Sequence, residues 1–167
     1  MILGTPSTHS FRMNDDYCFI FVHELAIKAS PSHLKEVNFS DIEYVGAEYY
    51  PQQSGWNCEC CGGKKYINAN IYFPGLLVEG LSQQFKYKLV DGRHRLDKMR
   101  INDMTKSNFY VYDYSEVEKL IYHCKSKVER DIIVNKVAEK CMHLRDCLLY
   151  TSPSPRDQRG SRMPSSA

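Results

Sequence analysis

The sequence predicts a small α/β domain of the α+β kind, with a mixed sheet, flanking helices and a helical extension toward the C-terminus. Three observations lead to this prediction: short apolar runs that alternate with period two, segments with helical spacing, and a strand, turn and helix in succession over residues 87–101. The chain has 167 residues, 43% of them hydrophobic and 25% charged, which suits one globular domain with extensions.

The first half of the chain offers mostly strand signals. Residues 1–16 are polar and show neither the helical nor the strand periodicity of apolar residues, so we expect a loose leader. Residues 17–27 are rich in aromatic and β-branched side chains and favour a strand, although a helix beginning at Glu24 fits equally well, and Pro31 ends either element. Alternation over residues 37–45 predicts another strand, and residues 46–63 have the composition of a long loop.

The second half alternates strands with helices. Residues 66–78 predict two short extended pieces around Pro74 and Gly75. Residues 87–90 and 108–112 are expected strands, and residues 93–101 are an expected helix. Ser115 and Glu118 match a capping box, which predicts a long helix continuing toward Leu144. Residues 17–114 are therefore the expected domain, and residues 115–146 its helical extension.

Residues 147–167 resemble translated sequencing adapter. The eleven residues 147–157 and the seven residues 161–167 match two successive adapter segments in one reading frame. We expect this tail to be an artefact that replaces the natural C-terminus. The whole chain has 22 basic and 20 acidic residues, and removing the three arginines and one aspartate of the tail leaves 19 of each. The remaining chain is therefore neutral overall.

The residues richest in chemistry form the turn after the strand at residues 87–90. They are Asp91, Gly92, Arg93, His94 and Arg95. A glycine lets the backbone approach a ligand closely, and a helix N-terminus offers N–H groups and a positive dipole end, so such a turn suits phosphate. Further positive charge is expected from Lys86, Lys88, Lys98 and Arg100. An Asp-Gly turn into a basic helix also occurs as a plain solvated corner.

The motif Val-Asp-Gly-x-His-Arg-Leu, with an apolar segment upstream and a strand downstream, resembles the ParB/sulfiredoxin superfamily over about residues 37–113. The resemblance implies a nucleotide, ATP or CTP with Mg²⁺, whose phosphates contact Gly92, His94 and Arg95, while Asp91 holds the turn or assists a metal. Arg93 stands where sulfiredoxins carry their catalytic cysteine, which argues against sulfiredoxin chemistry. The motif is closer to kinase-like and phage-associated members than to ParB proteins, whose turn contains Gly-Glu-Arg-Arg.

Two functions follow from the resemblance, and a purely structural role is the third possibility. The first is a nucleotide-dependent enzyme or switch, for which Glu43, Glu48 and Glu79 are candidate general bases. The second is a phage or bacterial DNA-binding accessory module that uses the same turn for backbone phosphate. Binding to DNA backbone should weaken steeply with salt, whereas a nucleotide pocket should lose less.

Three cysteines lie close together in the expected loop, at Cys58, Cys60 and Cys61. Thiolates in this arrangement could bind Zn²⁺, with His23, His33, His94 or Cys18 closing the site through the fold. Redox-active thiols and ordinary reduced cysteines are the alternatives.

The chain offers weak signals for membrane insertion or export. The longest apolar stretch, residues 17–27, is interrupted by His23 and Glu24 and is well short of the roughly 20 residues that span a bilayer. Residues 1–16 do not have the pattern of a signal peptide. We therefore expect a cytoplasmic protein without membrane contact, whose oligomeric state the sequence leaves open.

Overall fold

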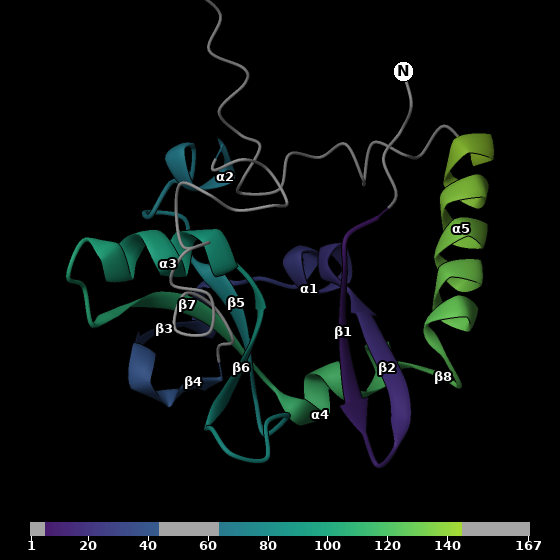
Figure 1. Ribbon diagram of the computed structural model, residues 1–167, viewed down its shortest axis with the longest axis horizontal. Coiled ribbons are helices and arrows are strands. Elements are labelled where there is room, and N and C mark those ends of the chain that lie inside the picture. Colours follow the sequence, from purple (N-terminus) through teal and green to yellow (C-terminus); the bar gives the residue numbers. More distant parts are fainter. Residues whose placement is uncertain (1–5, 44–63, 145–167) are drawn as a thin grey trace, which may run out of the picture.

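The computed structural model describes residues 6–43 and 64–144, and it contains two sheets with helices around them (Figure 1). In the five-stranded sheet the order is β3-β7-β5-β6-β4, and in the three-stranded sheet it is β1-β2-β8. The strands of the larger sheet are β3 (Leu34–Asn38), β4 (Ile42–Glu43), β5 (Gly75–Glu79), β6 (Tyr87–Asp91) and β7 (Lys106–Asp113).

The larger sheet is mixed, as the sequence predicts. Strand β5 runs antiparallel to β6 and parallel to β7, while β3 is antiparallel to β7 and β4 is parallel to β6. The expected strands at residues 87–90 and 108–112 correspond to β6 and β7, and the expected helix at residues 93–101 is α3 (Arg93–Ile101). These predictions are confirmed, and so is the α+β class.

The expectation of a loose leader over residues 1–16 is wrong for its second half. Strand β1 (Thr8–Met13) pairs along its whole length with β2 (Asp16–Phe21). Asn14 and Asp15 connect the strands with φ angles of 49° and 69°, the left-handed conformation that a tight hairpin requires. The strand escapes detection because β1 is polar at most positions and buries mainly Phe11.

Residues 17–27 contain both elements between which the sequence left a choice. After β2 ends at Phe21, helix α1 (Val22–Ile27) begins at once. The strand expected over residues 37–45 is interrupted by a short 3-10 helix, η2 (Phe39–Asp41), which separates β3 from β4. The first extended piece expected within residues 66–78 is wrong, because Tyr66 and Ile67 belong to helix α2 (Lys64–Ile67). The second piece is confirmed as β5.

The long helix predicted from Ser115 is also wrong at its start. The capping box uses Asp113 and Glu116, and it opens only the short helix α4 (Tyr114–Val117), which continues into η4 (Glu118–Leu120). Strand β8 (Tyr122–Cys124) then pairs with β2, so tertiary strand pairing overrides the helical spacing. Helix α5 (Lys127–Leu144) starts after Ser126, whose Oγ accepts the N–H of Glu129 at 3.3 Å.

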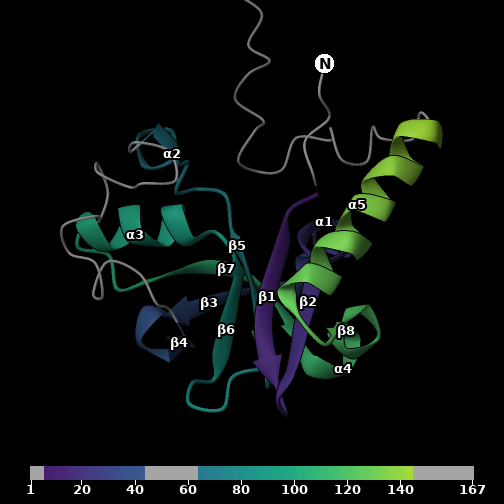
Figure 2. The ribbon, with the colours of Figure 1, turned by 45° about the vertical axis from the view of Figure 1, so that its right-hand side comes forward.

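The two sheets and their helices share three apolar clusters that order them into layers. One cluster joins Leu96 and Met99 of α3 to the larger sheet, a second lies between the two sheets around Ile20 and Tyr112, and a third joins Phe19 and Phe21 to α5. Figures 1 and 2 show α3 and α5 at opposite ends of the molecule. Helix α3 therefore packs on the larger sheet through a cluster separate from the one that joins the two sheets.

Candidate phosphate-binding turn

The turn between β6 and α3 is built on close contact between two glycines. Gly92 has φ 108° and ψ 20°, and a Cβ atom there would lie 3.1 Å from the Cα of Gly75. A Cβ on Gly75 would lie 2.8 Å from the carbonyl oxygen of Asp91, a distance that real Cβ atoms do not tolerate. Glycine is required at both positions because backbone packs directly on backbone.

Arg95 and Asp91 form a buried ion pair that fixes this turn. Arg95 Nη2 donates to Asp91 Oδ2 at 2.9 Å, and Nη1 donates to the carbonyl oxygens of Phe73 and Pro74 at 3.0 Å each. The Arg95 side chain is only 3% exposed. Its guanidinium therefore ties the turn to the residues that lead into β5. Phosphate contact by Arg95 stays a prediction, and it would require these bonds to rearrange.

His94 enters a second buried cluster on the same helix. Its ring lies edge-on to the ring of Tyr66 at 4.6 Å, and Tyr66 Oη donates to Asp97 Oδ2 at 2.8 Å. Asp97 is 1% exposed. Tyr66 and Asp97 are not among the site residues that the sequence predicts, because only the packing of α2 on α3 brings their side chains together. The sequence signal for this cluster is Asp97, a carboxylate four residues after Arg93 on the predicted helix.

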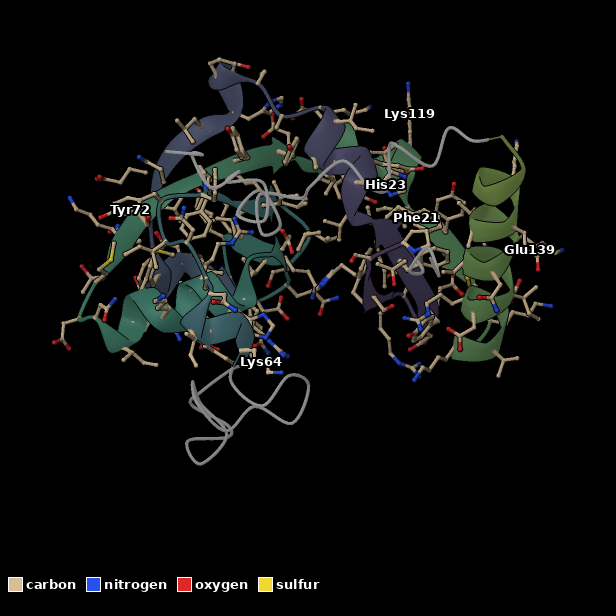
Figure 3. All side chains as sticks on the ribbon, turned by 90° about the horizontal axis from the view of Figure 1, so that it is seen from above. Phe21, His23, Lys64, Tyr72, Lys119 and Glu139 are labelled. Carbon is tan, nitrogen blue, oxygen red and sulfur yellow. The ribbon has the colours of Figure 1, made fainter. Side chains whose placement is uncertain are left out.

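A strap of residues 64–74, which we define as α2 and the segment up to β5, is held by polar side chains of α3. Lys98 Nζ donates to the carbonyl oxygens of Ile67 and Ala69, both at 2.9 Å. Together with the bonds of Arg95, four carbonyl groups of the strap are satisfied from one helix. Figure 3 shows Lys64 and Tyr72, near the two ends of this strap, on the side of the molecule away from Glu139 of α5.

The start of α3 differs from its buried interior. Gly92 is the N-cap, and within the described part of the chain no side chain caps the helix there. The first turn consists of Arg93, His94 and Arg95, of which Arg93 is exposed. The first N–H groups of a helix have no partner within the helix, and the dipole makes this end positive. Gly92, His94 and Arg95 are buried, so an anion would meet this end of the helix at Arg93.

The lysines expected to strengthen the positive field are occupied by other groups. Lys88 Nζ lies 3.3 Å from Glu43 Oε1, and Lys86 Nζ lies 3.8 Å from Glu79 Oε1. Both glutamates were candidate general bases, and both are paired with a cation. The pKa of Glu43 lies below its usual value because, although burial raises it, hydrogen bonds from Ser82 and Lys88 and the lysine charge outweigh burial. A lowered pKa makes Glu43 a weak base.

Glu48 and the cysteines Cys58, Cys60 and Cys61 lie outside the described residues, and so does the tail 147–167. Of the side chains named as a fourth zinc ligand, Cys18 is fully buried in β2, and burial raises the pKa of its thiol. Among residues 6–43 and 64–144 no group of three or more histidine, cysteine, aspartate or glutamate side chains is arranged to hold a metal. The zinc site at Cys58, Cys60 and Cys61 therefore stays a prediction, because these residues lie outside the described ranges.

No protein-family model matches the chain, and neither a curated protein nor a solved structure matches it significantly. The resemblance to the ParB/sulfiredoxin superfamily therefore stays a prediction from the motif at residues 90–96. In the described ranges no helix is both long enough and apolar enough to cross a membrane.

Proposed function

We propose that the turn of residues 91–95 binds the phosphate of a nucleotide or other phosphate ester. The observation that supports this most directly is the start of α3. Gly92 is left-handed there, no side chain of the described residues caps the helix, and the next residue, Arg93, is exposed. Such a start presents backbone N–H groups to an anion, and Arg93 adds charge-assisted hydrogen bonds. In this proposal the N–H groups and Arg93 contact the phosphate directly.

Asp91 and Arg95 have a positioning role in this proposal. Their buried pair spans Gly92, and the bond of Arg95 to the Phe73 carbonyl oxygen ties the turn to the strap. Mg²⁺ would neutralise phosphate charge when it arrives with the nucleotide. Asp91, the carboxylate of the turn, is buried against Arg95 and does not suit a metal ligand, so no step of the proposal depends on the metal.

The test is a titration of the full chain with ATP, CTP, ADP and GTP, each with Mg²⁺. Binding is measured by calorimetry or as a rise in melting temperature. Arg93→Ala is the informative variant because Arg93 is exposed and its loss should leave the fold intact. We expect a loss of about tenfold in affinity, the effect of removing one charge-assisted hydrogen bond. Lys119→Ala, at another exposed cation, is the matched control and should bind like the parent chain.

The same titration discriminates DNA binding. If the turn contacts backbone phosphate of DNA, the logarithm of the affinity for a duplex should fall steeply and linearly with the logarithm of the salt concentration. If a single nucleotide is the ligand, the dependence on salt is shallow. Failure of every nucleotide to bind, with Arg93→Ala indistinguishable from the parent chain, would refute the proposal.

A further inference from the structure

A second polar cluster lies apart from the turn, where the segment after α1 meets the start of α4. Its members are Ser30, His33 and Glu116. Ser30 is the N-cap of the 3-10 helix η1 (Pro31–His33), and Glu116 belongs to α4. Ser30 Oγ lies 2.9 Å from His33 Nδ1, and His33 Nε2 lies 3.0 Å from Glu116 Oε1. A hydroxyl, an imidazole and a carboxylate are thus connected in series.

The protons of this series can be assigned from its hydrogen bonds. The backbone N–H of Ser30 donates to His33 Nδ1 at 3.2 Å, so Nδ1 is an acceptor and the ring proton is on Nε2. Nε2 then donates to Glu116, and the hydroxyl of Ser30 donates to Nδ1. The Ser30 hydroxyl is therefore hydrogen-bonded to the imidazole of His33, whose Nε2 is hydrogen-bonded to the Glu116 carboxylate. This is the order of groups in a nucleophile triad.

The carboxylate and the imidazole of the series are both held in place. Glu116 Oε2 accepts the N–H of Asp113 at 2.9 Å, and the His33 ring packs against Tyr112 with the ring centroids 4.6 Å apart. The pKa of Glu116 lies below its usual value, chiefly because of its hydrogen bond with His33. The carboxylate is therefore ionised at neutral pH, as an orienting group must be.

Capping accounts for only part of this arrangement. Ser30 with His33 forms one capping box, and Asp113 with Glu116 forms another. Each box is complete within its own segment, so neither needs the contact between His33 and Glu116, which joins residues 83 positions apart. That contact is what turns two separate caps into a continuous path for a proton.

The cluster is open to solvent. Glu116 is 44% exposed and His33 is 16% exposed, while Ser32 is exposed and places its Oγ 2.7 Å from that of Ser30. Ser30 itself is partly exposed. The Ser32 hydroxyl is placed to donate a hydrogen bond to an oxyanion that develops next to Ser30.

We propose that Ser30, His33 and Glu116 form a nucleophile relay that hydrolyses small, activated carboxylic esters. Ser30 Oγ attacks the ester carbonyl while its proton moves to His33 Nδ1, which gives up its longer hydrogen bond from the backbone N–H of Ser30. That proton then passes to the departing alcohol as the carbon–oxygen bond to the alcohol breaks. Water then attacks the acylated Ser30, its proton moves to Nδ1 and returns to Ser30 Oγ, and the carboxylic acid leaves. Glu116 stabilises the imidazolium that forms in each half of the cycle.

The test uses the full chain with a fluorophosphonate probe, which bonds to activated serines, and with p-nitrophenyl acetate as substrate. We expect label on Ser30, located by peptide mass spectrometry, and ester hydrolysis faster than with heat-denatured chain. Glu116→Gln and His33→Gln should each slow labelling by about tenfold or more. Ser115→Ala, at an exposed serine outside the series, is the matched control and should retain the label on Ser30.

Ser30→Asn separates catalysis from capping, since asparagine caps a helix as well as serine but is no nucleophile. We expect this variant to remain folded, by circular dichroism, and to lose both label and hydrolysis. If Glu116→Gln unfolds the chain, Ser30→Cys provides the readout, because a relay makes its thiol alkylate faster than the thiol of Ser32→Cys. Labelling of Ser30 at the rate of denatured chain, or equal alkylation of the two thiols, would overturn the proposal.

Discussion

Removing the carboxylate of Asp91 should destabilise the fold far more than removing an exposed carboxylate. Asp91 and Arg95 have side chains only 6% and 3% exposed, with Oδ2 and Nη2 2.9 Å apart. In Asp91→Ala the guanidinium stays buried without its counter-charge. Breaking a buried pair in this way costs about 3–5 kcal/mol in the free energy of unfolding. For a chain of this length that corresponds to a fall in Tm on the order of 10 °C.

The assay is urea unfolding followed by far-UV circular dichroism, with Glu36→Ala as control. Glu36 pairs with Lys106 at 3.1 Å, but both side chains are more than half exposed, so its loss should cost under about 1 kcal/mol. The double variant Asp91→Ala with Arg95→Met should recover part of the loss, because it leaves neither charge buried. If Asp91→Ala costs no more than Glu36→Ala, the view that this pair fixes the turn is refuted.

Three further predictions concern single side chains. Gly75→Ala should lower the free energy of unfolding by about 1–3 kcal/mol, since its Cβ would lie 2.8 Å from a backbone oxygen, and a change under about 0.5 kcal/mol in urea unfolding would contradict this. Tyr66→Phe removes the hydrogen bond to Asp97 and should cost about 1.5–3 kcal/mol, with Tyr72→Phe, at a highly exposed tyrosine, as the neutral control. Burial first, and then the charge of Lys88, lowers the pKa of His9 from 6.5 to about 4. The unfolded chain therefore binds more protons than the folded chain between these values, so stability should fall as the pH decreases through this window, by at most about 3 kcal/mol. His9→Gln should flatten that dependence in urea titrations at pH 4.5 and 7, and an unchanged slope would show that His9 is not responsible.

The part of the site that lies within one segment could be predicted from the sequence. Strand β6, the turn and helix α3 are local, since Gly92 ends the strand and Leu96 and Met99 recur at helical spacing. The roles of its side chains were harder to predict. Arg95 was expected to face a ligand, and it faces Asp91 and the carbonyl groups of the strap. No local pattern distinguishes these two orientations, because the residues leading into β5 lie about twenty positions earlier.

Elements that depend on a partner strand were predicted poorly. Residues 122–124 have helical spacing with their neighbours, yet they extend as β8 because β2 offers a free edge. Strand β1 is mostly polar and is stabilised by pairing with β2. The series of Ser30, His33 and Glu116 likewise comes from two capping boxes that are distant in the chain and meet only in the folded protein.

The sequence by itself determined the α+β class, the mixed sheet and the strand, turn and helix around Gly92, since alternation, helical spacing and glycine conformation act over a few residues. Tertiary structure decided which charged groups are exposed. Arg93 faces solvent while Arg95, two residues later, is buried, because the strap packs on one face of α3 only. That choice depends on contacts between distant segments, and it determines which side chains remain available to a ligand.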